Sequence, residues 1–98
     1  MDPDFQREIV WAVQTGNLAK VEELLKNNPA LVFSRDNDGR TPLHVAAEEG
    51  CNEVARLLLA QKADVNARDN HGWAPLHIAV AHDNQAIVQL LRQSGGLE

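Results

Sequence analysis

The chain of 98 residues contains a single cysteine, Cys51, and few cations. One thiol cannot close an internal disulfide and leaves no pair of thiols for a zinc site, so the chain fits a reducing compartment, cytoplasmic or nuclear. Lys and Arg number 9 against 14 Asp and Glu, which gives a formal net charge of −5. Because nucleic-acid binding begins with clustered cations, we expect no nucleic-acid partner.

Long hydrophobic runs are also missing. The run from Val54 to Ala60 is interrupted by Arg56 and is far shorter than the roughly 20 residues that a membrane span needs. The first five residues carry two aspartates and lack the basic and apolar regions of a signal peptide. We therefore expect no membrane anchor and no targeting segment, and the length predicts one domain.

The sequence contains an internal repeat. Residues 36–46 read DNDGRTPLHVA and match residues 69–79, DNHGWAPLHIA, at an offset of 33. The match continues at the apolar positions of 54–58 and 87–91. A third, weaker copy runs from Ile9 to Leu25, displaced by one extra residue in the turn that follows it. This periodicity predicts three similar units.

The middle unit carries the signals of two short helices. One contains Leu43 to Ala47 and the other contains Val54 to Leu59, with glycine between them. Thr41 stands at the N-cap position of the first helix, and Pro42 follows where its missing N–H costs nothing. His44 comes three residues after the cap and can reach back to it, as Glu does in a capping box. We expect this histidine to be structural.

These motifs, in this order and spacing, resemble the ankyrin repeat: Gly-x-Thr-Pro-Leu-His-x-Ala-Ala, then Gly-x-x-Glu-Val-x-x-Leu-Leu-Leu, then Ala63 to Ala67. The resemblance covers about residues 5–96 and implies an all-α solenoid of helix-turn-helix units with short β-turn fingers. The repeats are expected at about 5–35, 36–68 and 69–96. Residues 1–4 are then an N-terminal extension, and 97–98, after Gly95-Gly96, the remnant of a tag. The usual activity of the family is binding other proteins.

The terminal repeats depart from the pattern at outward positions. Lys20 and Glu23 replace apolar residues in the first repeat, which predicts a polar N-terminal cap. In the third repeat Asp83 replaces glycine and Arg92 replaces leucine, which predicts a partial C-terminal cap. Three residues there stay apolar and are expected to form a patch that allows a homodimer: Val80, Ile87 and Val88.

Two further departures concern local backbone structure. Ala74 replaces the capping threonine, which should weaken that helix and leave His77 without its usual partner. Lys62 replaces the glycine expected at the end of the second helix, so a residue with a Cβ must adopt a left-handed conformation.

The resemblance implies a concave binding surface made by finger and first-helix positions that the repeat does not need for its own packing. We expect a rigid surface that docks a folded partner, and a basic partner would suit the acidic pair Glu48-Glu49. Trp73 either provides a binding hot spot or folds back onto the neighbouring finger, whereas Trp11 is expected in the core. The predicted partner-binding residues are Asn37, Asp38, Arg40, Glu48, Glu49, Asn70, His71, Trp73, Ala81 and His82.

The histidines do not predict a metal site. His44 and His77 belong to the repeat motif, and His71 and His82 lie far apart with no Cys or carboxylate at zinc-site spacing. No phosphate loop or hydrolase motif is present in the sequence, so we expect no cofactor.

Cys51 raises an alternative function. It replaces the Asn found at the equivalent positions 17 and 84, both expected as N-caps, and a thiol at a helix N-terminus is expected to have a lowered pKa. If the stacking of the repeats brings His82 close to Cys51, the two side chains would form a nucleophile–base dyad. An engineered cysteine esterase on this scaffold would use such a dyad. A purely structural or self-associating scaffold is the other alternative.

Overall fold

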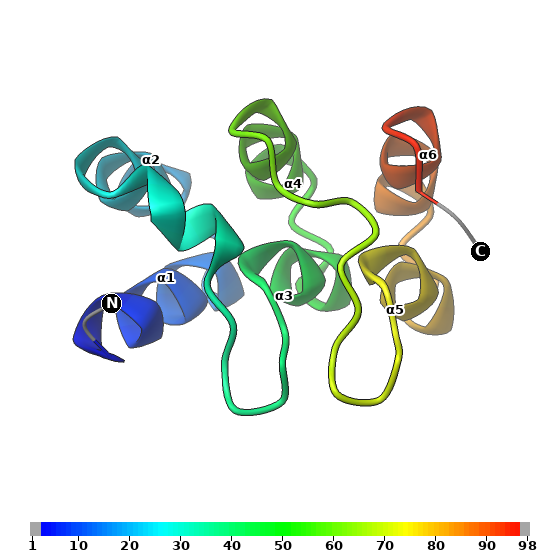
Figure 1. Cartoon of the computed structure of the whole chain (residues 1–98). Helices are drawn as coiled ribbons and strands as arrows, with labels where there is room; N and C mark the ends of the chain where they lie inside the picture. The colour runs from blue at the N-terminus through cyan, green and yellow to red at the C-terminus, as the bar shows by residue number, and fades with distance from the viewer. Residues whose placement is uncertain (1–2, 97–98) are drawn as a thin grey trace.

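The computed structural model describes residues 3–96, with side chains from residue 7 onward. Three helix pairs stand side by side (Figure 1). The first helices of the pairs, α1 (Pro3–Gln14), α3 (Pro42–Glu49) and α5 (Pro75–Ala81), form one row. The second helices, α2 (Leu18–Asn27), α4 (Asn52–Ala60) and α6 (Gln85–Gln93), form a second row against it. The predicted all-α repeat architecture is confirmed.

The ends of the chain bear on two predictions. Helix α1 begins at Pro3, inside the segment 1–4 that was expected to be an extension. Residues 1–2 lie outside the described residues, as does the predicted tag remnant at 97–98.

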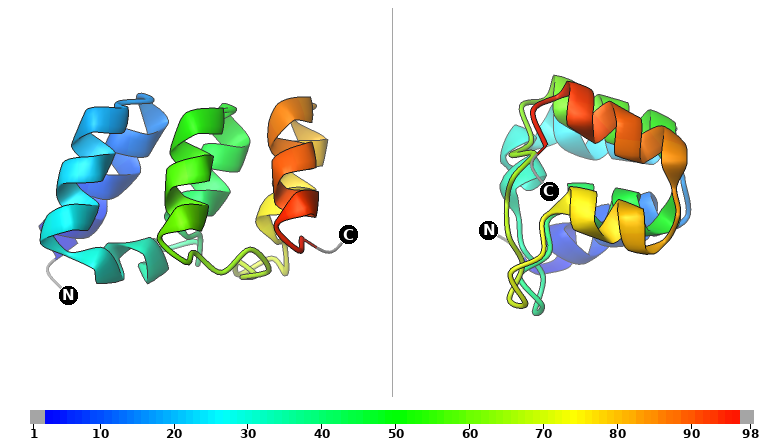
Figure 2. Two further views of the ribbon diagram at one scale, coloured as in Figure 1. Left: turned by 90° about the horizontal axis from the view of Figure 1, so that it is seen from above. Right: turned by 90° about the vertical axis from the view of Figure 1, so that its right-hand side faces the viewer.

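The fingers are two hairpin turns that project beyond the first row of helices (Figure 2). The amide of Asp36 donates to the carbonyl of Arg40 at 3.0 Å, and in the third repeat Asp69 donates to Trp73 at 2.9 Å. Gly39 adopts a φ of 75° at the first tip, and a Cβ there would lie 2.4 Å from Oδ1 of Asn70. Glycine is therefore required, because the second finger packs directly against it.

The short 3-10 helix η1 (Pro29–Phe33) leads from the first repeat into the first finger. Its Leu31 and Val32 are buried and join the core between the two rows of helices. The core is continuous through the three repeats, and Leu58 of α4 is fully buried near its middle.

The predicted caps are partly confirmed. Thr41 accepts a long hydrogen bond from the amide of His44, 3.4 Å, and donates its own amide to Nδ1 of His44, 3.1 Å. Asn17 caps α2 by accepting from Lys20. The expectation for His77 is only partly confirmed, because residue 74 offers no hydroxyl but its amide still donates to Nδ1 of His77 at 3.1 Å. Only the hydroxyl half of the capping interaction is missing there.

Asn84 does not cap α6, contrary to the prediction. Its Nδ2 donates to the carbonyls of Ala47 and Glu48, at 2.6 and 3.2 Å, and so ties the third repeat to the second. The expected left-handed conformation of Lys62 is confirmed by its φ of 70°. Asp83 also has a positive φ, 56°, which was not predicted from the sequence.

Trp11 is 56% exposed, so its prediction as a core residue is wrong. Ile9, Ala12 and Val13 are fully buried and share one face of α1 by their i, i+3, i+4 spacing. Residue 11 falls on the opposite side of the helix. The apolar character of its neighbours in sequence therefore did not indicate its orientation.

The predicted dimerisation patch is also wrong. Ile87 and Val88 are 1% and 4% exposed, because they lie on the face of α6 that joins the core, and Val80 is exposed at 52%. These three residues do not form a contiguous apolar surface.

Candidate functional site

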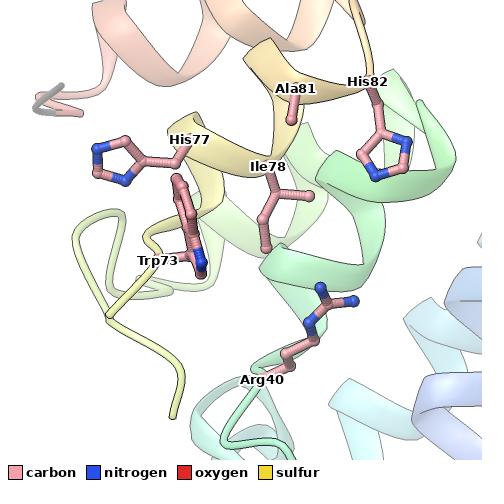
Figure 3. Close-up of a pocket in the computed structure, with 6 residues that line it drawn as sticks. All are labelled: Arg40, Trp73, His77, Ile78, Ala81 and His82. Carbon is pink, nitrogen blue, oxygen red and sulfur yellow. The ribbon is translucent and has the colours of Figure 1, made fainter. Parts of the chain in front are cut away.

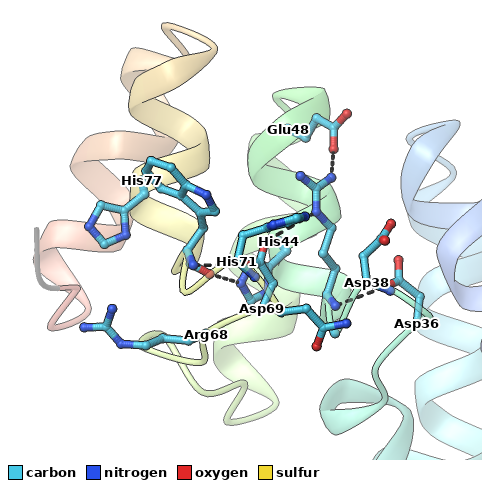
Figure 4. A network of polar contacts seen from close by, with 12 residues as sticks. Asp36, Asp38, His44, Glu48, Arg68, Asp69, His71 and His77 are labelled. Atoms are coloured by element: carbon cyan, nitrogen blue, oxygen red, sulfur yellow. Dashed lines mark hydrogen bonds and ion pairs between the residues drawn. The ribbon is translucent and has the colours of Figure 1, made fainter.

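The backbone of Trp73 is held from both sides. Oδ1 of Asp69 accepts the amides of His71 and Trp73, each at 2.9 Å. Because Nδ1 of His44 accepts the Thr41 amide, its Nε2 carries the proton and donates to the carbonyl of Trp73 at 2.8 Å. The finger of the third repeat is thereby fixed to α3 of the second (Figure 4).

The side chain of Trp73 is 50% exposed. Its ring meets the ring of His77 edge-on, with centroids 5.6 Å apart and planes at 72°. The ring therefore packs on α5 of its own repeat rather than on the neighbouring finger. Half of its surface stays open to solvent while its backbone is fixed.

Burial is the main reason why the pKa of His44 is lowered from 6.5, although its bond to Trp73 and the nearby Asp69 act in the opposite direction. Burial would raise the pKa of Asp69, but the amides of Trp73 and His71 and the nearby histidines outweigh it, so this pKa is lowered. Neutral His44 and ionised Asp69 are the forms that hold the finger at neutral pH.

Arg40 joins the first finger to α3 and to the second finger. One of its terminal nitrogens, Nη1, forms a short ion pair with Glu48, and its Nε lies 3.7 Å from Oδ2 of Asp69. That buried oxygen has no hydrogen-bond partner among the described residues, so Arg40 provides its nearest compensating charge.

Two pockets flank Trp73 on the exposed side of α5. The smaller one measures about 150 Å³ and is shown in Figure 3. The larger one measures about 350 Å³. Both are lined by Trp73, His77 and Ala81. The smaller pocket adds Arg40, Ile78 and His82, and the larger adds Leu76, Val80 and Arg92.

Four of the predicted binding residues thus meet in one pocket: Arg40, Trp73, Ala81 and His82. The prediction missed His77 and Ile78. His77 was assigned wholly to the repeat motif, yet it stands four residues before Ala81 on α5, a spacing that brings the two residues to one side of the helix.

The other predicted binding residues lie outside both pockets. Asn70 joins the two fingers, donating its amide to the carbonyl of Asp38 at 2.9 Å and its Nδ2 to that of Asn37 at 3.0 Å. Glu48 pairs with Arg40. Glu49 and His71 are exposed.

Cys51 faces the first repeat. Its Sγ donates to the carbonyl of Val13 at 3.4 Å and caps no amide of α4. The expectation of a lowered pKa is wrong: burial, and secondarily Glu49, raise the pKa of the thiol. His82 belongs to the third repeat and lines the pocket beside Arg40. The structure therefore does not bring these two side chains together as a dyad.

Between residues 3 and 96 no three His, Cys, Asp or Glu side chains gather where a metal ion could bind. Within the same range, no helix combines the length and the apolar character needed to cross a membrane.

Comparison with known proteins gives a family and several relatives. A family model described as ankyrin repeats (3 copies) matches residues 9–97. The serine/threonine-protein kinase VIK of Arabidopsis thaliana is 43% identical over 89 residues, which is 91% of this chain and 20% of the kinase. Ankyrin repeat domain-containing protein 49 of Drosophila melanogaster is 43% identical over 58 residues, 59% of this chain and 27% of that protein. The chain thus matches only a minor part of the length of each relative.

Proposed function

The chain belongs to the ankyrin repeat family, and from that premise we propose that it is a protein-interaction module that docks a folded partner on the exposed side of α5. We name this surface the Trp73 face and define it by the residues that line the two pockets. These are Arg40, Trp73, Leu76, His77, Ile78, Val80, Ala81, His82 and Arg92.

The observation that carries the proposal is the presentation of Trp73. A half-exposed tryptophan offers a large contact area, and tryptophan is enriched among the residues that dominate binding energy at interfaces. Asp69 and His44 fix its backbone before any partner arrives. A surface that is already ordered loses little conformational entropy on binding, so more of the contact energy remains as affinity.

The pockets on both sides of the ring support the same surface. They give a partner places to insert side chains next to an anchor, the arrangement found at the centre of well-packed interfaces. The fingertips contribute differently: Asn70 is engaged with Asn37 and Asp38, so these residues support the surface rather than form its centre.

Site-specific photocrosslinking tests this proposal. A photoreactive phenylalanine derivative is placed at position 73 in one variant and at Glu53, an exposed position of α4, in a matched control. Both variants are expressed in cells and irradiated. We expect a defined crosslinked protein from position 73 and none from position 53. Equal crosslinking at both positions, or none at position 73, would refute the proposed surface.

A further inference from the structure

The Trp73 face differs in charge from the rest of the molecule. The chain carries 14 acidic residues against 9 Lys and Arg, yet no acidic residue lines either pocket. The charged residues that line them are Arg40 in the smaller pocket and Arg92 in the larger. The remaining polar side chains are Trp73, an N–H donor, and the rings of His77 and His82.

The two pockets form one binding surface across α5. His77 and Ala81 lie one helical turn apart and line both pockets. Figure 3 shows Arg40 and His82 on one side of the smaller pocket, Trp73 and His77 on the other, and Ile78 between them. One turn beyond His77, the border between the two pockets is formed by the small side chain of Ala81. This low border lets a single segment of a partner reach both pockets.

Arg40 already binds a carboxylate in this structure. Its Nη1 pairs with Glu48, a side chain that is itself about one-third exposed. Guanidinium groups have five N–H donors and favour planar carboxylates. Glu48 and Asp69 engage only the Nη1 and Nε sides of Arg40. An incoming carboxylate can therefore bind at the guanidinium beside Glu48 or displace it.

The volumes indicate what enters each pocket. About 150 Å³ is the size of a cavity that holds one six-carbon ring, hence one side chain. The larger pocket, about 350 Å³, is bordered by Trp73, Leu76 and Val80 and suits a bulky apolar side chain. Each pocket thus combines an arginine with apolar groups: Arg40 lies beside Ile78 in the smaller one, and Arg92 beside Leu76 and Val80 in the larger one. This lining favours a ligand that has both acidic and apolar groups.

We infer that the Trp73 face binds an acidic peptide segment of the partner, with a glutamate or aspartate carboxylate on Arg40 in the smaller pocket and an apolar side chain in the larger one. The inference rests on the proposed function and specifies its partner. It differs from the sequence-based expectation of a basic partner for Glu48 and Glu49, because Glu48 is engaged by Arg40.

The probe is a set of blocked peptides of about ten residues, a length typical of short recognition segments. Each has one leucine flanked by glutamates at varied spacing, and matched sets carry glutamine or lysine instead of glutamate. Binding is followed by the fluorescence of Trp73 and by the NMR signal of its indole N–H, in a Trp11→Phe background that leaves Trp73 as the single tryptophan.

We expect a saturable change with at least one glutamate peptide, a dissociation constant at least about tenfold weaker for its glutamine analogue, and no binding of the lysine analogue. Added salt should weaken the glutamate complex, because its charges are partly exposed. Lysine peptides that bind as tightly as the glutamate peptides would overturn the inference. So would the absence of binding by every glutamate peptide.

Two substitutions with opposite expected effects sharpen the test. Arg40→Gln should weaken the glutamate complex about tenfold or more, while Arg56→Gln, at an exposed position of α4, should leave it unchanged. Glu48→Gln should tighten it by removing the competing carboxylate, while Glu53→Gln should not. Tighter binding of the Glu48 variant cannot come from a loss of folding, and weaker binding would contradict the inference.

The outcomes also separate this inference from the proposed function. Crosslinking from position 73 without any binding of acidic peptides refutes the acidic segment and retains the interaction surface. Failure of the crosslinking at position 73 refutes the surface itself.

Discussion

Ala74→Thr should raise the free energy of unfolding by about 1 kcal/mol, because it restores the missing half of an N-cap. Residue 74 has φ −86° and ψ 164°, almost the values of Thr41, −86° and 167°. The backbone is therefore already in the conformation that places a threonine hydroxyl over the first turn of the helix, and no rearrangement is required.

The magnitude follows from the contacts of Thr41. Its Oγ1 lies 2.9 Å from Nδ1 of His44 and accepts the amide of His44 at 3.4 Å. In the third repeat His77 keeps the other contact, with the amide of Ala74. Caps contribute about 0.5–2 kcal/mol, and the long amide contact places this one near the middle of that range.

Urea unfolding followed by far-UV circular dichroism measures the effect, with an unchanged m-value as the sign that the denatured state is not altered. Ala74→Val is the matched control, because valine has the shape of threonine without the hydroxyl. The Thr variant should be more stable than the Val variant as well as the parent. Equal stabilities of the Thr and Val variants would refute the capping argument.

Three further predictions concern the same fold. Leu58→Ala should cost about 2–5 kcal/mol of unfolding free energy, because Leu58 is fully buried; a cost no larger than that of Leu57→Ala, at a half-buried position, would contradict its place in the core. Lys62→Gly should stabilise the protein by about 1 kcal/mol in urea unfolding, since it removes a left-handed non-glycine residue; an unchanged midpoint would show that no strain is stored there. Burial lowers the pKa of His44 below 6.5 in the folded protein. As the pH falls through 6.5, the unfolded chain therefore binds more protons than the folded one, and the free energy of unfolding should decline from that pH downward. The same titration of a His44→Gln variant should lack this decline, and an identical decline would assign it to other groups.

Much of the fold was predictable because the repeat encodes it locally. The period of 33 residues, the Thr-Pro-Leu-His sequence and the spacing of the leucines determine caps and core positions through short-range chemistry. The capping box of Thr41 and His44 therefore forms as predicted. The left-handed conformation of Lys62 also followed from its alignment with a glycine of the repeat pattern.

The errors occurred where orientation or a neighbouring repeat decides the outcome. Trp11 was assigned from the apolar residues beside it, although its angular position on α1 directs it to solvent. Asn84 has the residue type of a cap, but the carbonyls of Ala47 and Glu48 lie within reach and bind its amide instead. Cys51 likewise bonds to the preceding repeat, through Val13. Such contacts depend on how the repeats stack, which residue type alone does not specify.

The candidate site was predicted in part for the same reason. Arg40, Trp73, Ala81 and His82 occupy positions that the repeat leaves exposed, and they line one pocket. His77 was missed because its role in the helix cap did not reveal that its ring also packs against Trp73.

Trp73 is the proposed anchor of binding, and the most direct measurement compares Trp73→Ala with Trp11→Ala in binding to the protein that crosslinks at position 73. Both tryptophans are about half exposed, so the two variants remove similar surface from opposite ends of the stack. We expect Trp73→Ala to weaken binding by about 2 kcal/mol or more and Trp11→Ala to leave the affinity unchanged. Equal losses, or a loss confined to Trp11→Ala, would contradict the Trp73 face as the binding surface.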